Sequence, residues 1–188
     1  RNIDPDGRVI VDATGKPITY SSSDGWSRNA TDDVKFIHRG LMLTNTGQEQ
    51  WEKAYSSPNK IEMNLVDQRL SRKNDEPALG TANQALVKNQ LGGRASKGDG
   101  VMKIKISIPN INDSFEGKNK DLTFVEAVAA TAGHEIEHTT EDNRDIGVHN
   151  ATFPFAKRDI EREPERVGRQ IREESRARPD ERLFVPLE

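Results

Sequence analysis

The sequence predicts an α+β fold with a small antiparallel or mixed sheet, a buried helix and a charged C-terminal helix. Apolar and polar residues alternate at 61–65 and again at 101–108, as expected for two half-buried strands. Residues 121–140 are apolar nearly all round in their first half, which is typical of a buried helix. Residues 159–178 are highly charged with a few regularly spaced apolar residues, which indicates a second helix with one buried side.

Length and composition limit the domain organisation and the partners. The chain has 188 residues, of which 32% are hydrophobic and 31% are charged, so it is polar for a globular protein. We expect a linker over 1–33 and one folded domain over 34–188. The net charge of −3 and the lack of a long apolar run argue against nucleic-acid binding and membrane insertion. There are no cysteines, which excludes disulfides, thiolate catalysis and cysteine-based zinc sites.

The N-terminal part is rich in turn signals. Residues 1–33 contain D-P-D-G, T-G-K-P and S-S-S-D-G, and only 9–11 suit a short strand. A short helix is expected over 46–56, with Thr46 as its N-cap.

The middle of the chain should supply the sheet. The strand at 61–65 is followed by 71–100, which we expect to form a long loop around a weak helix at 81–90. The strand at 101–108 has lysines on one face, which suits an edge strand, and Pro109 ends it.

The C-terminal half should be helical with one long loop. In the helix at 121–140, Thr123 and Glu126 have the spacing of a capping box. A loop is expected over 142–158, and the charged helix at 159–178 follows it.

The sequence H-E-I-E-H at 134–138 is the strongest functional signal. On a helix, His134 and His138 project from one face, one turn apart, and can bind a single Zn²⁺ ion. Glu135 lies one step round the helix, so it would flank the metal and act as general base towards a zinc-activated water. This division of roles is that of the H-E-x-x-H zinc peptidases. The alternative is a polar helix end with incidental histidines.

A catalytic zinc needs a third protein ligand. The spacing of metzincins would require a histidine at position 144, which is Arg144, so that subtype is excluded. In gluzincin-type sites a glutamate of the next helix is the ligand, often with an acidic residue four positions later that orients a ligating histidine. Glu161 fits as the ligand with Glu165 in support. Glu165 or His149 as the ligand, and a solvated acidic face, stay open as alternatives.

Substrate binding is less well specified. His149 is a candidate for polarising the scissile carbonyl or holding the oxyanion. The edge strand at 101–108 would bind an extended peptide by strand addition and place a peptide bond against the metal.

Several stretches resemble a known group of proteins. The opening N-I-D-P-D-G-R-V is similar to the end of the core domain in Rhs/YD-repeat proteins, which precedes a variable C-terminal toxin. T-G-Q-E-Q-W, A-G-H-E-I-E-H and the later E-x-x-P and I-R-E-E resemble zincin-type metallopeptidase toxins related to bacterial effector peptidases. The sequence departs from their pattern at Gly168-Arg169, where relatives often carry Glu-Asn, and near Phe184, where they carry a tyrosine.

The resemblance implies a polymorphic toxin. Residues 1–33 would then be the remnant of an Rhs core with a linker, and 34–188 a zincin-like metallopeptidase domain. The domain would be released from its carrier, secreted or translocated into a target cell, and cleave a protein there. A cognate immunity protein would protect the producer. Alignment on I-R-E-E places the third ligand of the family on Glu161.

Two other functions compete with a zinc endopeptidase. In the first, the metal is structural and the domain acts by binding a partner. In the second, the zinc site hydrolyses a different bond, for example as a cell-wall amidase.

Overall fold

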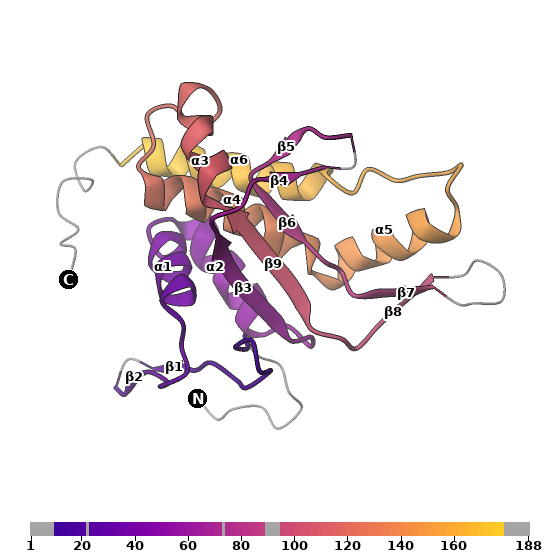
Figure 1. The fold of residues 1–188 in the computed structure, drawn as a ribbon, viewed down its shortest axis with the longest axis horizontal. Helices are drawn as coiled ribbons and strands as arrows, with labels where there is room; N and C mark the ends of the chain where they lie inside the picture. The colour runs from indigo at the N-terminus through magenta and orange to yellow at the C-terminus, as the bar shows by residue number, and fades with distance from the viewer. Residues whose placement is uncertain (1–9, 22, 73, 89–94, 179–188) are drawn as a thin grey trace.

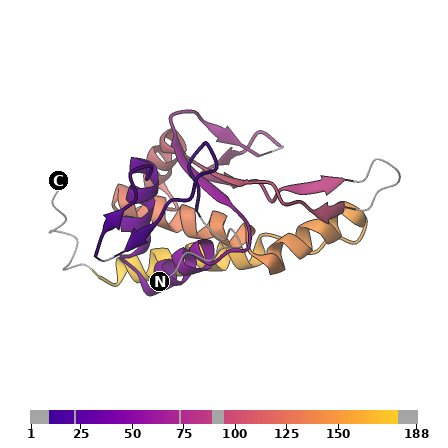
Figure 2. The ribbon, with the colours of Figure 1, turned by 90° about the horizontal axis from the view of Figure 1, so that it is seen from below.

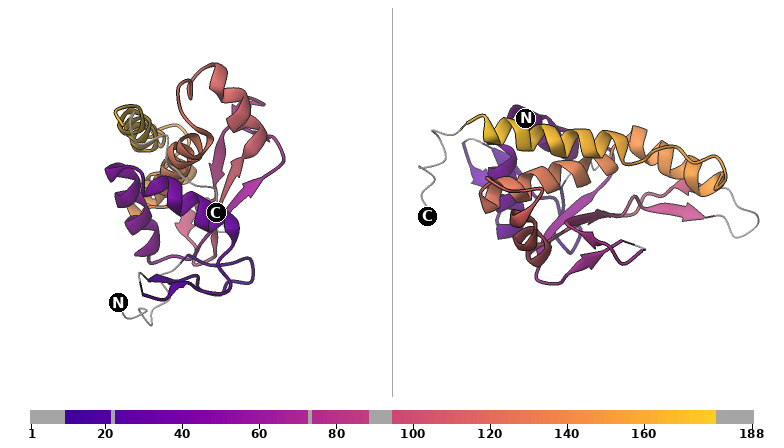
Figure 3. Two further views of the ribbon diagram at one scale, coloured as in Figure 1. Left: turned by 90° about the vertical axis from the view of Figure 1, so that its left-hand side faces the viewer. Right: turned by 90° about the horizontal axis from the view of Figure 1, so that it is seen from above.

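A small mixed sheet covers one side of a layer of helices. The computed structural model describes residues 10–21, 23–72, 74–88 and 95–178 (Figure 1). The central sheet has three strands in the order β3-β9-β6. The long helix α4 lies beneath this sheet, and α6 lies on the far side of α4 from the strands (Figures 2 and 3). The prediction of a fold that combines helices with a small mixed sheet is therefore confirmed.

The strand at 101–108 occupies the centre of the sheet. β9 (Met102–Ser107) pairs in parallel with β3 (Ile61–Val66) and antiparallel with β6 (Gly80–Ala82). Its prediction as an edge strand was wrong. The lysines that suggested an edge lie on the uncovered face of the sheet, where Lys103 forms an ion pair with Glu62 of β3 at 3.2 Å.

The predicted loop and weak helix between these strands are replaced by short strands. β4 (Leu70–Ser71) pairs with β5 (Pro77–Ala78), and β7 (Leu86–Lys88) pairs with β8 (Ala95–Lys97). The helix expected at 81–90 is absent from the described residues of that range, which belong to β6, β7 and their connection. The left-handed backbone of Ala85 (φ 49°) is incompatible with a continuous helix there.

The described part of the N-terminal segment packs against the rest of the protein. Ile10 and Ile18 are fully buried, and Ile10 forms a parallel bridge with Ile61. A small hairpin of β1 (Tyr20–Ser21) and β2 (Gly25–Trp26) follows. Residues 1–9, which include D-P-D-G, lie outside the described part.

Two helices follow the hairpin. α1 (Asp32–Leu41) is capped by Thr31, and α2 (Asn45–Tyr55) is capped by Thr44, whose hydroxyl accepts from Gly47 N. Thr46 is therefore not the N-cap. It lies inside α2, and its hydroxyl and amide both donate to Glu174.

α4 is the centre of the helical layer. A short helix α3 (Ile108–Asp113) and a 3-10 turn at Ser114–Glu116 lead from β9 to α4 (Phe124–His138). The predicted capping box is confirmed, because Thr123 accepts from the Glu126 amide while the Glu126 carboxylate accepts from Thr123 N at 2.7 Å. α4 packs against α1, α2, α6, β6 and β9.

The loop predicted at 142–158 is largely a helix. α5 (Glu141–Thr152) begins after Thr140, and α6 (Arg162–Arg176) follows a short connection. α5 has no apolar stripe that a sequence pattern could reveal. It is fixed by Arg144, which is 2% exposed and donates to the backbone oxygens of Gln84 and Gly98. No helix in the described residues is long and apolar enough to cross a membrane.

Candidate metal centre

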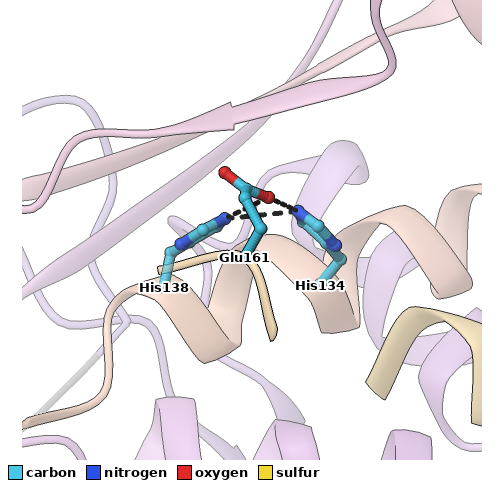
Figure 4. Close-up of side chains that lie close together, drawn as sticks. All are labelled: His134, His138 and Glu161. Carbon is cyan, nitrogen blue, oxygen red and sulfur yellow. Dashed lines mark hydrogen bonds and ion pairs between the residues drawn. The ribbon is translucent and has the colours of Figure 1, made fainter. Parts of the chain in front are cut away.

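The two histidines of α4 point towards the same place. His134 and His138 lie one turn apart near the C-terminal end of the helix, and their Nε2 atoms are 3.2 Å apart (Figure 4). Both rings are largely buried, with side-chain exposures of 12% and 11%. The i, i+4 spacing thus produces the expected convergence.

Glu161 completes the cluster from the start of α6. It is the N-cap residue of that helix, and its Oε2 lies 3.3 Å from His134 Nε2 and 3.5 Å from His138 Nε2 (Figure 4). The side chain makes no capping hydrogen bond to α6, since it extends towards α4 instead. The structure therefore brings together the three residues that the sequence suggested as ligands.

Two glycines allow α6 to approach α4 closely enough for this contact. A Cβ on Gly133 would overlap the Ile171 side chain, and one on Gly168 would lie 3.1 Å from the Ala130 carbonyl oxygen and 3.3 Å from His134 Cβ. Because the helices leave little room for a Cβ at these positions, the glycines help α6 to hold Glu161 beside the histidines.

The shape of the cluster fits a tetrahedral zinc ion. Ligand atoms at about 2.0–2.1 Å from zinc in a tetrahedron are about 3.3–3.4 Å from one another, and the three atoms here are separated by 3.2, 3.3 and 3.5 Å. Glu161 Oε2 is also buried without a hydrogen-bond partner. A buried oxygen facing two imidazole nitrogens is well satisfied by a cation between them.

The charged groups of the cluster shift one another's pKa values. The close contacts of Glu161 Oε2 with His134 and His138, which are ion-pair contacts rather than well-aligned hydrogen bonds, hold the pKa of Glu161 well below its ordinary value. Burial acts to lower the pKa of His138, but the contact with Glu161 and the negative charges of Glu161 and Glu135 raise it overall. The carboxylate thus stays ionised, as a metal ligand must.

Glu135 lies beside the cluster rather than in it. It is 5% exposed, and its Oε1 is 4.0 Å from His134 Nε2. Burial raises the pKa of Glu135, and the two histidines offset only part of this effect. Gly80 of β6 lies directly against it, because a Cβ there would be 2.9 Å from Glu135 Oε1.

The cluster opens into a cavity of about 440 Å³. The edge strand β6 forms one wall, and the floor is formed by His134, Glu135 and His138. Ile160 and Glu161 close another side. The arrangement is therefore accessible to a ligand along β6.

The other candidates lie apart from the three ligands. Glu165 of α6 is paired with Lys118 at 3.3 Å, and the nearby charges of Lys118 and His134 outweigh the effect of burial and lower its pKa. His149 lies on α5, where its Nε2 is 2.8 Å from the Ala156 carbonyl oxygen. It is absent from the described lining of the cavity. Its role in holding an oxyanion stays a prediction without a contact to support it.

Two residues of the site were not predicted from the sequence. Gly80 was assigned to a loop, although a glycine in a short strand signals a close approach of another group. Asn143 was also assigned to a loop; it is 3% exposed on α5 and helps to raise the pKa of His138. No local sequence signal identifies Asn143, because its proximity to His138 depends on how α5 turns back after α4.

Comparisons of the chain with family models, curated proteins and solved structures found no match.

Proposed function

We propose that the protein is a zinc-dependent endopeptidase with a zincin-like fold and a gluzincin-like ligand set. The observation that carries this proposal is the triangle of His134 Nε2, His138 Nε2 and Glu161 Oε2, whose sides match a tetrahedral zinc site. A buried glutamate directly after the first histidine supports hydrolysis rather than a purely structural metal. Three protein ligands leave one position open, as catalytic zinc sites require.

The chemistry needs a metal, a base and a place for the substrate. Zinc at this position would lower the pKa of a water molecule to about 7 and polarise a carbonyl group. Glu135 would accept a proton at its carboxylate and deliver it to the leaving amine. The burial that raises its pKa suits a group that must take up and release a proton near neutral pH.

The edge strand β6 is the best position for an extended substrate. β9 cannot bind a peptide by strand addition because β3 and β6 occupy both of its edges. β6 lies at the end of the sheet and lines the cavity beside Glu135. A peptide paired with β6 would place a backbone carbonyl near the three ligands.

The biological setting in this proposal rests on resemblance alone. The D-P-D-G opening and the order of the motifs support a polymorphic toxin domain released from an Rhs carrier and delivered into a target cell. A protein substrate in that cell and a cognate immunity protein belong to the same proposal.

Metal analysis of purified variants tests the ligand set. We expect about one zinc per chain in the wild type and in Glu165→Gln, and a strongly reduced content in His134→Ala and Glu161→Gln. Full zinc retention in Glu161→Gln would remove Glu161 from the ligand set and favour Glu165 or His149.

The Glu135→Gln variant separates the competing functions. It should keep the metal but lose peptide hydrolysis, and toxicity as well if toxicity depends on cleavage. Glu163→Gln is the matched control, because Glu163 is exposed and, among the described residues, bonds only to Arg166. Toxicity that survives Glu135→Gln would indicate partner binding, and activity on cell wall but not on peptides would indicate an amidase.

A further inference from the structure

A second cavity lies on the other side of Glu135. Its volume is about 300 Å³, and it shares His134, Glu135 and Gly80 with the first cavity. Its walls come from β5, the second half of α4, residues of the segment 113–118, and α6. A group attached to a peptide bond at the metal centre can therefore enter it directly.

A buried arginine lines this cavity. Arg172 of α6 is only 7% exposed, and among the described residues it makes neither a hydrogen bond nor an ion pair. Burial lowers the pKa of Arg172, which reflects the cost of holding a cation away from water. Buried guanidinium groups are normally paired, so an unpaired one beside a cavity indicates a ligand that supplies the anion.

The acidic residues around the cavity are already engaged. Glu165 attracts Arg172 electrostatically but forms its ion pair with Lys118, and Asp113 is paired with Arg69. Glu135 is the proposed base. The positive charge of Arg172 therefore remains available to a ligand.

The opposite wall of the cavity is held in place. The Asn110 side chain is 3% exposed and donates to the carbonyl oxygens of Leu70 and Ala78, both at 2.7 Å. These bonds fix the β4–β5 hairpin, which contributes Ala78 and Arg72 to the lining. A fixed wall opposite a charged group is typical of a pocket that selects one kind of side chain.

We propose that this cavity binds a carboxylate of the peptide substrate next to the scissile bond, and that Arg172 determines this specificity. The inference rests on the proposed peptidase function. A carboxylate matches the planar guanidinium group with two parallel hydrogen bonds. The carboxylate is that of an aspartate or glutamate side chain or the C-terminus of a peptide, and the two sources are separated by the test.

The first measurement is the rate of cleavage of matched peptides by the zinc-loaded protein. A cleaved peptide is resynthesised with Glu, Gln or Lys at each position flanking the scissile bond, and with a free or amidated C-terminus. At one flanking position we expect kcat/KM for Glu to exceed that for Gln by about 10- to 100-fold, the usual effect of a charge-assisted hydrogen-bonded pair. A preference only for the free C-terminus would assign the pocket to a terminal carboxylate.

Variants of Arg172 connect the preference to the residue. Arg172→Leu should bring the Glu-to-Gln ratio close to one, and Arg172→Lys should retain part of it because the charge remains. Arg169→Leu is the matched control, since Arg169 is exposed on the same helix and absent from the described lining. The proposal would be overturned if the wild type preferred neither Glu over Gln nor a free over an amidated C-terminus, or if its preference survived Arg172→Leu.

A second measurement does not depend on catalysis. The side-chain Nε–H NMR signal of Arg172 is followed while N-acetylglutamate α-amide or N-acetylglutamine α-amide is added. We expect a saturable shift with the first compound only. No shift with either compound would reject the carboxylate pocket even if peptides are cleaved. A shift without any peptide cleavage would retain the pocket and reject the peptidase.

Discussion

α4 and α6 both contribute to the candidate metal centre, but their N-termini are built differently. α4 begins with a complete capping box, in which Thr123 and Glu126 satisfy each other's backbone amides. α6 begins at Glu161, which gives its side chain to the histidines and makes no capping bond. The N-terminus of α4 is therefore built for helix stability, whereas that of α6 supplies a side chain to the candidate metal centre. The difference indicates that Glu161 is held at a cost to its own helix.

Replacing Glu161 with Asn should have the largest effect on zinc affinity. It also separates the role of Glu161 as a metal ligand from its role as the N-cap of α6. A structural zinc site with four ligands contributes about 10–16 kcal/mol, so loss of one ligand should weaken zinc binding by on the order of 3 kcal/mol, or about a hundredfold. Asn is also a good N-cap, so the metal-free variant should gain about 0.5–1 kcal/mol of stability when it is measured at a pH well above 6.5, where His138 is no longer protonated to pair with Glu161. Competition with a zinc indicator and urea unfolding in a chelator measure the two effects. A loss of metal-free stability would contradict the account of α6.

Replacing Gly133 with Ala should separate the helices. The new Cβ would overlap Ile171, so we expect a loss of about 1–3 kcal/mol from overpacking, reduced by up to about 1 kcal/mol from better helix propensity. Zinc affinity should fall as well, because Glu161 moves with α6. Gly117→Ala is the control, since a Cβ there meets nothing within 4 Å. Unchanged zinc binding in the destabilised variant would show that α6 does not position Glu161.

Removing the cap of α4 should affect stability alone. Thr123→Ala deletes the hydroxyl that accepts from Glu126 N, which should cost about 1 kcal/mol of unfolding free energy. The site lies at the other end of the helix, so zinc affinity should stay the same when measured well below the unfolding temperature.

The pH dependence of the metal-free protein should show the smallest effect. The pKa of Glu161 is lowered from 4.5, so its contribution to stability is present above that pH and is lost as the pH falls further. The pKa of His138 is raised from 6.5, so its contribution is present below that pH and is lost as the pH rises above it. Metal-free stability should therefore be greatest between about pH 4.5 and 6.5, and Glu161→Gln should flatten the profile in chemical denaturation.

The sequence was most informative where the decisive interactions are local. The capping box of α4 and the convergence of His134 and His138 follow from fixed helical spacings. Glu161 was predicted from its four-residue spacing to Glu165 and from the alignment on I-R-E-E, yet it acts from the N-cap position. The ligand was therefore proposed for a partly different reason from the one that the structure provides.

Interactions between distant segments were not predictable in the same way. β9 is central because β6 pairs with its second edge, and this pairing consists of only three residue pairs among the described residues. α5 was not predicted because Arg144 holds it through the backbone oxygens of distant residues. Such contacts leave no periodic pattern of apolar residues in the sequence.

The position of Glu161 has a consequence for the chain that precedes it. His138 and Glu161 are the two ends of a segment that contains α5 and the connection to α6. A metal ion bound by both residues would close this segment into a ring and limit the conformations open to it. Chelation would then remove the catalytic ion and would also release this conformational restraint on the segment. Protease cleavage within 139–160 should therefore accelerate when the metal is withdrawn, which gives a measure of metal occupancy that needs no substrate.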